Sequence, residues 1–444
     1  MSIEQFLKNK NILVFGLGRQ GGGIGDANYL ARHGYIVRVI DRYTLNELDI
    51  APSMLEPNIE LSLGSEKQSD VDWADIIIQN PGVPDNHPLV LYAKEQYKQV
   101  VSAIALFVQF SPIPTIGITG TRGKTTTTML IYDILNYIYP DQIILGGNLP
   151  GTSGLDLFDR CENKKYAVLE LSSFQLHSFH HQQISPNYSV VTNLYPDHLN
   201  RYSTMDEYLL DKTAIVRYQK KPGFVVYNQE NEGSIKIANY ANVTKLPYQV
   251  SDTANITTLL PGKHNLSNIA AAYRLATALN LESKKVLLAI SQFKGVNYRQ
   301  QLIATLNGVR YINDTTATTP IASVIALKAQ TSPTILICGG ESKNLPEEIL
   351  LTEIKNNPHL AHLIVLGSHN LTGFVESLQE LVPQKLAGQV NSMEAAVNLA
   401  AKLAKPNYTV LLSPGFASFD LFKNEFDRGD QFNHYVSLLA QQKK

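Results

Sequence analysis

Short apolar runs alternate with amphipathic segments along the whole chain. Residues 11–18, "NILVFGLG", have the pattern of a strand that ends in a glycine turn, residues 25–34 have helical spacing, and residues 35–42, "YIVRVIDR", again have the pattern of a strand. Apolar runs at residues 74–84 and 98–107 extend the series. A strand, helix, strand order of this kind predicts a parallel sheet. We therefore expect a first α/β domain that closes near residue 101.

The same alternation continues to the end of the chain. Further strands are predicted at residues 113–120, 166–173, 187–194, 223–228, 333–340, 362–368 and 408–415, and helices at 129–139, 205–219, 265–279 and 393–404, with 293–301 as a connector. We predict an α/β fold of three domains. They are an N-terminal Rossmann-like domain (1–101), a central P-loop ATPase-like domain with a mainly parallel sheet (102–296) and a C-terminal Rossmann-like domain (297–444).

Length and composition agree with this division. At roughly 150 residues per domain, a chain of 444 residues suggests about three. The net charge of −1 gives no overall field for nucleic acid or an anionic membrane, so we expect neither as a partner. The N-terminus lacks the features of a secretory signal, and Cys161 and Cys338 form no metal or disulfide pattern. These features favour a cytoplasmic protein.

Residues 117–128, "GITGTRGKTTTT", carry the first candidate chemistry. Gly120 and Gly123 free the backbone N–H groups to face an anion, and the following helix adds its positive end. Lys124 supplies a mobile cation and Thr125 a hydroxyl for a phosphate-bound Mg²⁺ ion. The usual P-loop rule requires a glycine at position 118, which is Ile118 here. A glycine turn that only caps a helix therefore remains the alternative.

The N-terminal segment "GLGRQG" offers a second phosphate-binding pattern. Gly16, Gly18 and Gly21 match GxGxxG after a strand, and Asp41 ends the next strand where a ribose-binding acid would lie. Alone, this indicates a dinucleotide dehydrogenase. The second, triphosphate-type loop argues against hydride transfer, and close helix–strand packing without a ligand is the other interpretation.

Three polar residues of the central domain could join the phosphate loop. Glu170 and His198 each follow a predicted strand, at the sheet edge where open α/β proteins bind ligands, and Lys212 lies on a later helix. A carboxylate, an imidazole and the Thr125 hydroxyl could share one Mg²⁺ ion. The run "HSFHHQQ" at residues 177–183 is interpreted as a solvated loop, because no acidic or cysteine partner stands at metal-ligand spacing.

Six segments together carry a family resemblance: "TGTRGKTTTT", "LELSSFQL", "DHLNRY", "PGKHNLSN", "YINDTTAT" and "SPGFASFDLFKNEFDRGDQF". With them the chain resembles the Mur ligases, the ATP-dependent amino-acid ligases of peptidoglycan synthesis, over essentially its whole length. It is most similar to the branch that adds D-glutamate to UDP-N-acetylmuramoyl-L-alanine. The family's own phosphate motif, TGTxGK[ST][ST], accounts for the unusual glycine spacing. The resemblance implies that ATP activates a carboxylate as an acyl phosphate, which the amine of glutamate then attacks.

The resemblance also implies roles for particular residues. ATP would contact Gly120, Thr121, Arg122, Gly123, Lys124, Thr125, Thr126, Asn268, Arg299 and Asp314. Mg²⁺ would be held by Thr125, Glu170, His198 and a carbamylated Lys212, and Lys124, His198 and Lys212 would be catalytic. The UDP-linked substrate would contact Arg19, Gln20, Asp41, Arg42, Gly82, Asn148, Ser172 and Gln175, and the glutamate would contact Thr318, Lys343 and Ser418.

Some positions depart from the family pattern. Arg122 stands where asparagine is common, Thr316 replaces a usual lysine, Glu425 replaces an aromatic residue, and the segment "GGGIGD" is about two residues longer than usual. A sibling ligase that uses L-glutamate or another amino acid is therefore one alternative. A catalytically idle regulator that binds a nucleotide sugar is another. We expect a monomer.

Overall fold

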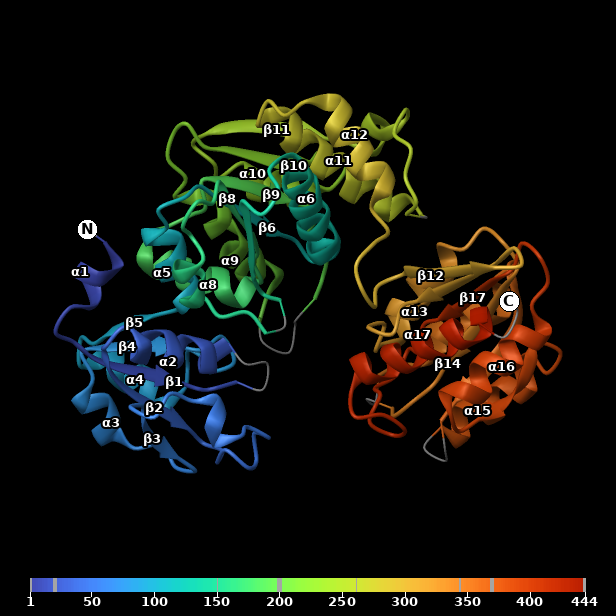
Figure 1. The fold of residues 1–444 in the computed structure, drawn as a ribbon, viewed down its shortest axis with the longest axis horizontal. Helices are drawn as coiled ribbons and strands as arrows, with labels where there is room; N and C mark the ends of the chain where they lie inside the picture. The colour runs from blue at the N-terminus through green and yellow to red at the C-terminus, as the bar shows by residue number, and fades with distance from the viewer. Residues whose placement is uncertain are drawn as a thin grey trace. The chain divides into compact units, whose positions relative to one another are not determined.

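The computed structural model describes residues 2–18, 22–149, 151–197, 202–260, 262–342, 345–367 and 371–441 (Figure 1). The chain divides into two compact units. One comprises Met1–Thr257 with Leu266–Ser291, and the other Thr258–Asn265 with Gln292–Lys444. No helix among the described residues combines the length and apolar character needed to cross a membrane.

The first sheet lies at the start of the chain and is parallel, with the strand order β3-β2-β1-β4-β5. Its strands are β1 (Asn11–Phe15), β2 (Ile36–Asp41), β3 (Glu60–Leu63), β4 (Ile76–Gln79) and β5 (Gln99–Val101). The helices of this part are α1 (Ile3–Leu7), α2 (Gly22–Arg32), α3 (Gln68–Trp73), α4 (Pro88–Glu95) and α5 (Ala103–Phe110), with a short 3₁₀ turn at Pro52–Met54.

The second sheet is also parallel, in the order β11-β10-β9-β6-β8-β7. Its strands are β6 (Thr115–Thr119), β7 (Ile143–Gly147), β8 (Tyr166–Glu170), β9 (Tyr188–Val191), β10 (Phe224–Asn228) and β11 (Thr244–Tyr248). The associated helices are α6 (Lys124–Ile138), α7 (Asp156–Asp159), α8 (Ser173–Gln182), α9 (Met205–Arg217), α10 (Glu232–Ala238), α11 (Lys263–Ala278) and α12 (Ser283–Gln292), with a 3₁₀ turn at Val250–Thr253.

The third sheet belongs to the second compact unit and has the order β12-β13-β17-β14-β15-β16. Its strands are β12 (Gln301–Leu306), β13 (Val309–Asn313), β14 (Thr334–Cys338), β15 (Leu360–Leu366), β16 (Leu386–Val390) and β17 (Thr409–Leu412). Only the edge strand β12 runs antiparallel to its neighbour. The helices are α13 (Pro320–Lys328), α14 (Glu348–Asn356), α15 (Thr372–Leu381), α16 (Met393–Leu403) and α17 (Glu425–Gln441).

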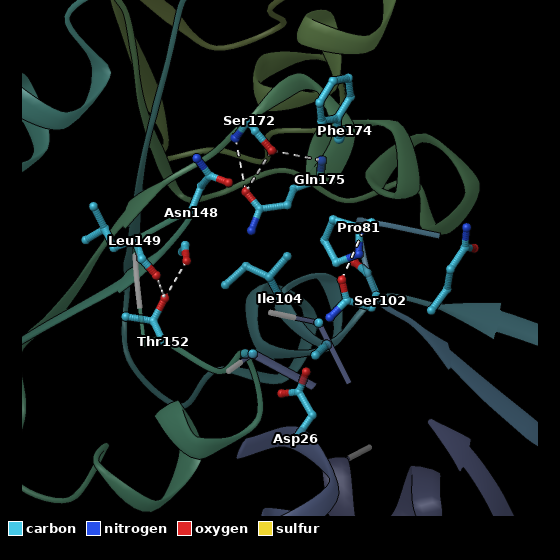
Figure 2. A pocket seen from close by; sticks show the side chains of 18 residues that line it. Asp26, Pro81, Ser102, Ile104, Asn148, Leu149, Thr152, Ser172, Phe174 and Gln175 are labelled. Atoms are coloured by element: carbon cyan, nitrogen blue, oxygen red, sulfur yellow. Dashed lines mark hydrogen bonds between the residues drawn. The ribbon is translucent and has the colours of Figure 1, made fainter. Parts of the chain in front are cut away.

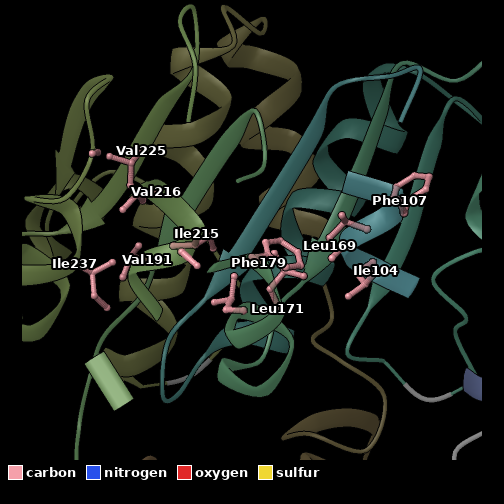
Figure 3. Packing of buried hydrophobic residues seen from close by; sticks show 14 of the residues in the cluster. Ile104, Phe107, Leu169, Leu171, Phe179, Val191, Ile215, Val216, Val225 and Ile237 are labelled. Atoms are coloured by element: carbon pink, nitrogen blue, oxygen red, sulfur yellow. The ribbon is translucent and has the colours of Figure 1, made fainter. Parts of the chain in front are cut away.

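Apolar side chains on one face of the second sheet form a continuous core with helices α5, α8 and α9 (Figure 3). Leu169 and Val191 from the strands are fully buried, as are Phe179 of α8 and Ile215 of α9. Burying a side chain of this size stabilises a fold by about 1.5–3 kcal/mol. This core therefore fixes α8 and α9 against the strands whose carboxyl ends carry the candidate site.

The predicted α/β class with three parallel or mainly parallel sheets is confirmed. β5 ends at Val101, where the first sheet was expected to close, and α5 begins at Ala103 within the same apolar run. The Ser102 hydroxyl accepts a hydrogen bond from the N–H of Ala105, which starts this helix. The domain boundaries at residues 101 and 296 stay predictions.

Candidate functional site

The loop after β6 has the backbone of a phosphate cradle. β6 lies between β9 and β8, and α6 begins at Lys124 directly after the loop. Gly123 adopts a left-handed conformation (φ 80°), and a Cβ there would lie 2.3 Å from Oδ1 of Asn268. Only glycine fits both demands without strain. The loop thus places the first N–H groups of α6 at the carboxyl edge of the sheet, which suits an anion.

Two lysines converge on the carbonyl oxygen of Gly120. Nζ of Lys124 lies 3.1 Å from it and Nζ of Lys212 lies 3.2 Å from it. Lys212 is only 1% exposed, and it also donates to the Thr119 hydroxyl. Burial, followed by repulsion from Lys124, lowers the pKa of Lys212 well below its usual value. Lys212, on α9, is therefore shifted towards the neutral amine.

Glu170 supplies a carboxylate with one free oxygen beside this pair. It ends β8 opposite Ile118, is 3% exposed, and accepts a hydrogen bond from Nδ2 of Asn148 at 3.0 Å. Its Oε2 is buried and has no hydrogen-bond partner among the described residues. A buried carboxylate oxygen without a donor is costly, and a cation removes that cost.

The donor set around Glu170 therefore fits Mg²⁺, which prefers oxygen ligands. Thr125 lies in the first turn of α6 and could supply a hydroxyl. The third predicted ligand, His198, lies outside the described residues. Within the described ranges, no three His, Cys, Asp or Glu side chains gather in a metal-binding group.

Arg122 differs from the neighbouring loop residues because its side chain is half exposed. Its backbone N–H donates to Oδ1 of Asn193, and its guanidinium Nη2 lies 3.7 Å from Oδ2 of Asp197. The contact is long and solvent-exposed, which makes it weak. The Arg122 guanidinium therefore stays available to an anion beside the phosphate loop. Its partner Asp197 directly precedes His198 in the sequence.

Two adjoining cavities lie where the predicted residues for the UDP-linked substrate come together. The first, of about 420 Å³, is lined by Asp41 and Arg42, and the second, of about 390 Å³, by Asn148, Ser172 and Gln175. Figure 2 shows the second cavity, with Asn148, Ser172 and Gln175 on one side and Asp26 on the other. Both cavities share Gly18, Asn80 and Gly82. The predicted Arg19 and Gln20, like Gly21, lie outside the described residues.

The Asp41 carboxylate accepts hydrogen bonds from backbone N–H groups and so positions the glycine loop. One carboxylate oxygen accepts from the N–H of Leu17 at 2.9 Å and the other from the N–H of Tyr43 at 3.0 Å. Ser172 and Gln175 likewise form a capping box at the start of α8. These residues thus shape the cavity walls, while their remaining lone pairs and N–H groups stay available to a ligand.

The second unit holds the remaining candidates that the structure describes. Asp314 is buried, accepts from the N–H of Gln300 at 3.0 Å and from the Ser413 hydroxyl at 2.9 Å, and burial raises its pKa to about 7. Arg299 is exposed, and Ser418 is 2% exposed. Thr318 is half-buried on the loop after β13. The predicted Lys343 lies outside the described residues.

Arg428 is a residue of this region that the sequence did not single out. Its side chain is fully buried, and the guanidinium donates to the Thr315 hydroxyl and carbonyl and to the carbonyls of Phe416 and Ala417. It therefore joins the loop that leads to Thr318 with the loop that leads to Ser418. An arginine within an otherwise polar segment gives no sequence signal for burial.

The histidine run was wrongly interpreted as a solvated loop. It lies on α8, where His177 bonds two carboxylates and His180 lies between Tyr218 (Nδ1···OH 3.0 Å) and the carbonyl of Leu210 (Nε2···O 2.7 Å). The partners come from α9 and from the first sheet's loops, so no spacing within the run could reveal them.

Asp26 and Asn80 were also missed. Asp26 is buried at the cavity wall, and Asn80 accepts from the N–H of Gly82 and lies at both cavities. The one available signal was an acid within a mainly apolar helical stretch at residues 24–31.

Comparisons with known proteins agree on one family. Residues 118–276 match the Mur ligase middle domain, and residues 10–102 match the "Mur ligase MurD-like, N-terminal domain". A UDP-N-acetylmuramoylalanine--D-glutamate ligase from Roseiflexus sp. is 34% identical, over 98% of this chain and 100% of that protein. A protein of the same name from Borreliella afzelii is 32% identical, over 98% of this chain and 99% of its own length.

Solved structures show the same fold at lower identity. UDP-N-acetylmuramate-alanine ligase from Thermotoga maritima has a TM-score of 0.59 at 17% identity, covering 98% of this chain and 100% of its own. MurF ligase from the same organism, solved in complex with ADP, has a TM-score of 0.56 at 17% identity, covering 100% and 98%.

Proposed function

The chain belongs to the Mur ligase family, whose members form amide bonds at the expense of ATP, and we propose that it joins D-glutamate to UDP-N-acetylmuramoyl-L-alanine. The observation that carries the proposal is the grouping of Lys124, Lys212 and the unpaired oxygen of Glu170 at one carboxyl edge of the second sheet. This edge is where open α/β proteins bind ligands. An idle regulator would have no need for a costly buried lysine there.

The phosphate loop would bind ATP, and Lys124 would offset the charge that develops on the transferred phosphoryl group. Thr121, Arg122, Thr126 and Asn268 would surround the phosphates and nucleoside. Bound Mg²⁺ would neutralise phosphate charge, held by Thr125, Glu170 and His198. The product of the first step would be an acyl phosphate on the alanyl carboxylate.

Lys212 suits a role as a carbamylated metal ligand. A neutral amine is the form that reacts with carbon dioxide, and burial, followed by repulsion from Lys124, lowers the pKa of Lys212 and so favours that form. Its carbamate would be an anion facing the cation, and the repulsion from Lys124 would become attraction.

The two adjoining cavities would bind the UDP-linked substrate. Asp41, Arg42 and the glycine loop with Arg19 and Gln20 would hold the uridine end, and Gly82, Asn148, Ser172 and Gln175 the diphosphate, sugar and peptide. Gly18 and Gly82 line both cavities, which supports one elongated ligand across the pair.

The glutamate would be held by Thr318, Lys343 and Ser418, and Arg299 and Asp314 would serve the nucleotide. Two carboxylates require cationic and hydroxyl donors, which these residues provide. The proposal includes a monomer that acts in the cytoplasm.

The test is a phosphate-release assay with the full chain, ATP, Mg²⁺ and UDP-N-acetylmuramoyl-L-alanine. D-glutamate is offered in one reaction, and L-glutamate and other amino acids in parallel ones. Release with D-glutamate alone is the expected result. Release with L-glutamate but not D-glutamate would support the sibling ligase suggested by Thr316 and Glu425. No release with any amino acid, despite binding of the nucleotide sugar, would support the idle regulator.

A further inference from the structure

His177 on α8 lies between two carboxylates from different parts of the first unit. Its Nδ1 lies 2.8 Å from Oδ1 of Asp211 on α9, and its Nε2 lies 3.1 Å from Oδ2 of Asp85 in the loop between β4 and α4. A carboxylate can only accept a hydrogen bond, so each ring nitrogen must carry a proton to bond its partner. The geometry therefore favours the imidazolium form.

The surroundings of His177 favour that charged form. The hydrogen bond that His177 donates to Asp211 and the charges of Asp211 and Asp85 raise the pKa of His177, against burial and the charge of Lys94 on α4. Among the described residues, Lys98 lines the same cavity as His177, and His180 on α8 has its pKa lowered first by burial and also by the charge of His177. His181, one turn along α8, has its ring centroid 5.1 Å away. Burial first, then the charge of His177, lowers the pKa of His181, so it adds little positive charge.

The two partners of His177 lead to the two functional regions. Asp85 closely follows Asn80 and Gly82, which line both cavities for the UDP-linked substrate. Asp211 directly precedes Lys212, the buried lysine at the phosphate loop. His177 itself follows Gln175, on the opposite wall of the second cavity.

We propose that His177 is a positioning residue that ties the loop at residues 80–87 to α8 and α9, and so holds the two walls of the nucleotide-sugar cavity together. Loss of its proton breaks one of the two bonds. The bond to Asp85 is the one released, because Asp85 is more exposed than Asp211 (31% against 11%) and keeps Gln79 and Lys94 as partners. The affinity for the UDP-linked substrate then falls as pH rises through the pKa of His177.

The test compares three variants of the full chain between pH 6 and 9. Titration with UDP-N-acetylmuramoyl-L-alanine should show wild-type affinity weakening as pH rises. His177→Gln should bind about tenfold more weakly at pH 6, as expected for losing a charged hydrogen bond, and with no such pH dependence. His177→Arg, always charged and able to bridge two carboxylates, should keep the pH 6 affinity across the whole range.

The matched control is His181→Gln, on the same helix and beside the same loop, which should follow the wild type. A His177→Gln profile that coincides with the wild type would overturn the proposal. So would a His177→Arg variant as weak as His177→Gln, since a mainly steric role of the ring would give that result.

The inference rests on the proposed function only for its ligand. Hydrogen exchange of residues 80–87 without ligand separately tests whether His177 holds this loop against α8 and α9; this link is called the tie below. After correction for intrinsic rates, this loop should lose protection between pH 6 and 9 in the wild type and not in His177→Arg. Wild-type protein that shows this loss but binds no UDP-N-acetylmuramoyl-L-alanine would refute the proposed function and leave the tie standing, and unchanged protection would refute the tie.

Discussion

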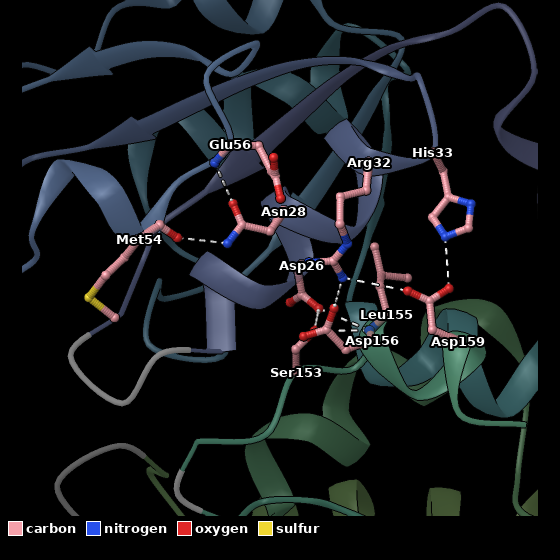
Figure 4. A network of polar contacts seen from close by, with 10 residues as sticks. All are labelled: Asp26, Asn28, Arg32, His33, Met54, Glu56, Ser153, Leu155, Asp156 and Asp159. Atoms are coloured by element: carbon pink, nitrogen blue, oxygen red, sulfur yellow. Dashed lines mark hydrogen bonds and ion pairs between the residues drawn. The ribbon is translucent and has the colours of Figure 1, made fainter.

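Replacement of Asp26 by alanine should destabilise the contact between α2 and the segment before α7 (Figure 4). Asp26 is buried, and its Oδ1 accepts from the Ser153 hydroxyl at 2.5 Å and from the N–H of Leu155 at 2.9 Å. The approach is close, because a Cβ on Gly25 would lie 2.5 Å from Cβ of Ser153. Water has little room to replace the carboxylate.

The expected loss follows from the groups left behind. An unsatisfied buried donor costs about 1–3 kcal/mol, so the hydroxyl and the amide together give about 2–6 kcal/mol. At about 2–4 °C per kcal/mol, the melting temperature of the first unit should fall by about 4–24 °C. The measurement is a thermal scan by circular dichroism at pH 7.5. An Arg32→Ala control removes the exposed ion pair to Asp156 in the same contact and should cost less than about 1 kcal/mol.

Asp26→Asn separates the hydrogen bonds from the charge. Burial raises the pKa of Asp26 to about 6, above its ordinary value of 3.8. The folded chain therefore binds more protons than the unfolded chain between these values, and this group's contribution to stability declines as pH rises through that window. Asparagine keeps the acceptor without the charge, so this variant should match or exceed the wild type at pH 7.5. Asp26→Ala melting within about 1 °C of wild type would refute the reasoning.

The other predictions concern the phosphate loop and the second unit. Lys124→Ala should abolish phosphate release while the dissociation constant of the UDP-linked substrate, measured by calorimetry, changes less than about twofold. Depleting bicarbonate should reduce wild-type turnover reversibly if Lys212 is carbamylated, and irreversible loss would contradict this. Gly123→Ala should raise KM for ATP at least about tenfold, because it strains the loop and displaces Asn268. Arg428→Met should lower the melting temperature of the second unit by several degrees, leaving nucleotide-sugar affinity unchanged.

The sequence was sufficient to predict those helices and strands whose apolar pattern is strong. Buried central strands such as β6 and β14 were predicted because every position is apolar or small. The edge strands β3 and β11 were missed because half or more of their side chains are exposed and no apolar run marks them.

The residues of the candidate site likewise fall into those that the sequence could predict and those that it could not. Lys124 and Thr125 could be predicted because the phosphate motif is continuous in sequence. Asp26 and His177 could not, because their partners lie 127 and 34 residues away and are brought near only by packing. The family motifs located Lys212, but its neutral state depends on burial and on Lys124, which no local pattern encodes.

The shared carbonyl of Gly120 makes the two lysines interdependent. If Lys124 were lost, the repulsion that helps to keep Lys212 neutral would be lost with it, and Lys212 would hold its proton more firmly. One substitution would then impair both the phosphate contact and the reactive amine. The phosphate contact and the reactive amine therefore depend on the same pair of side chains.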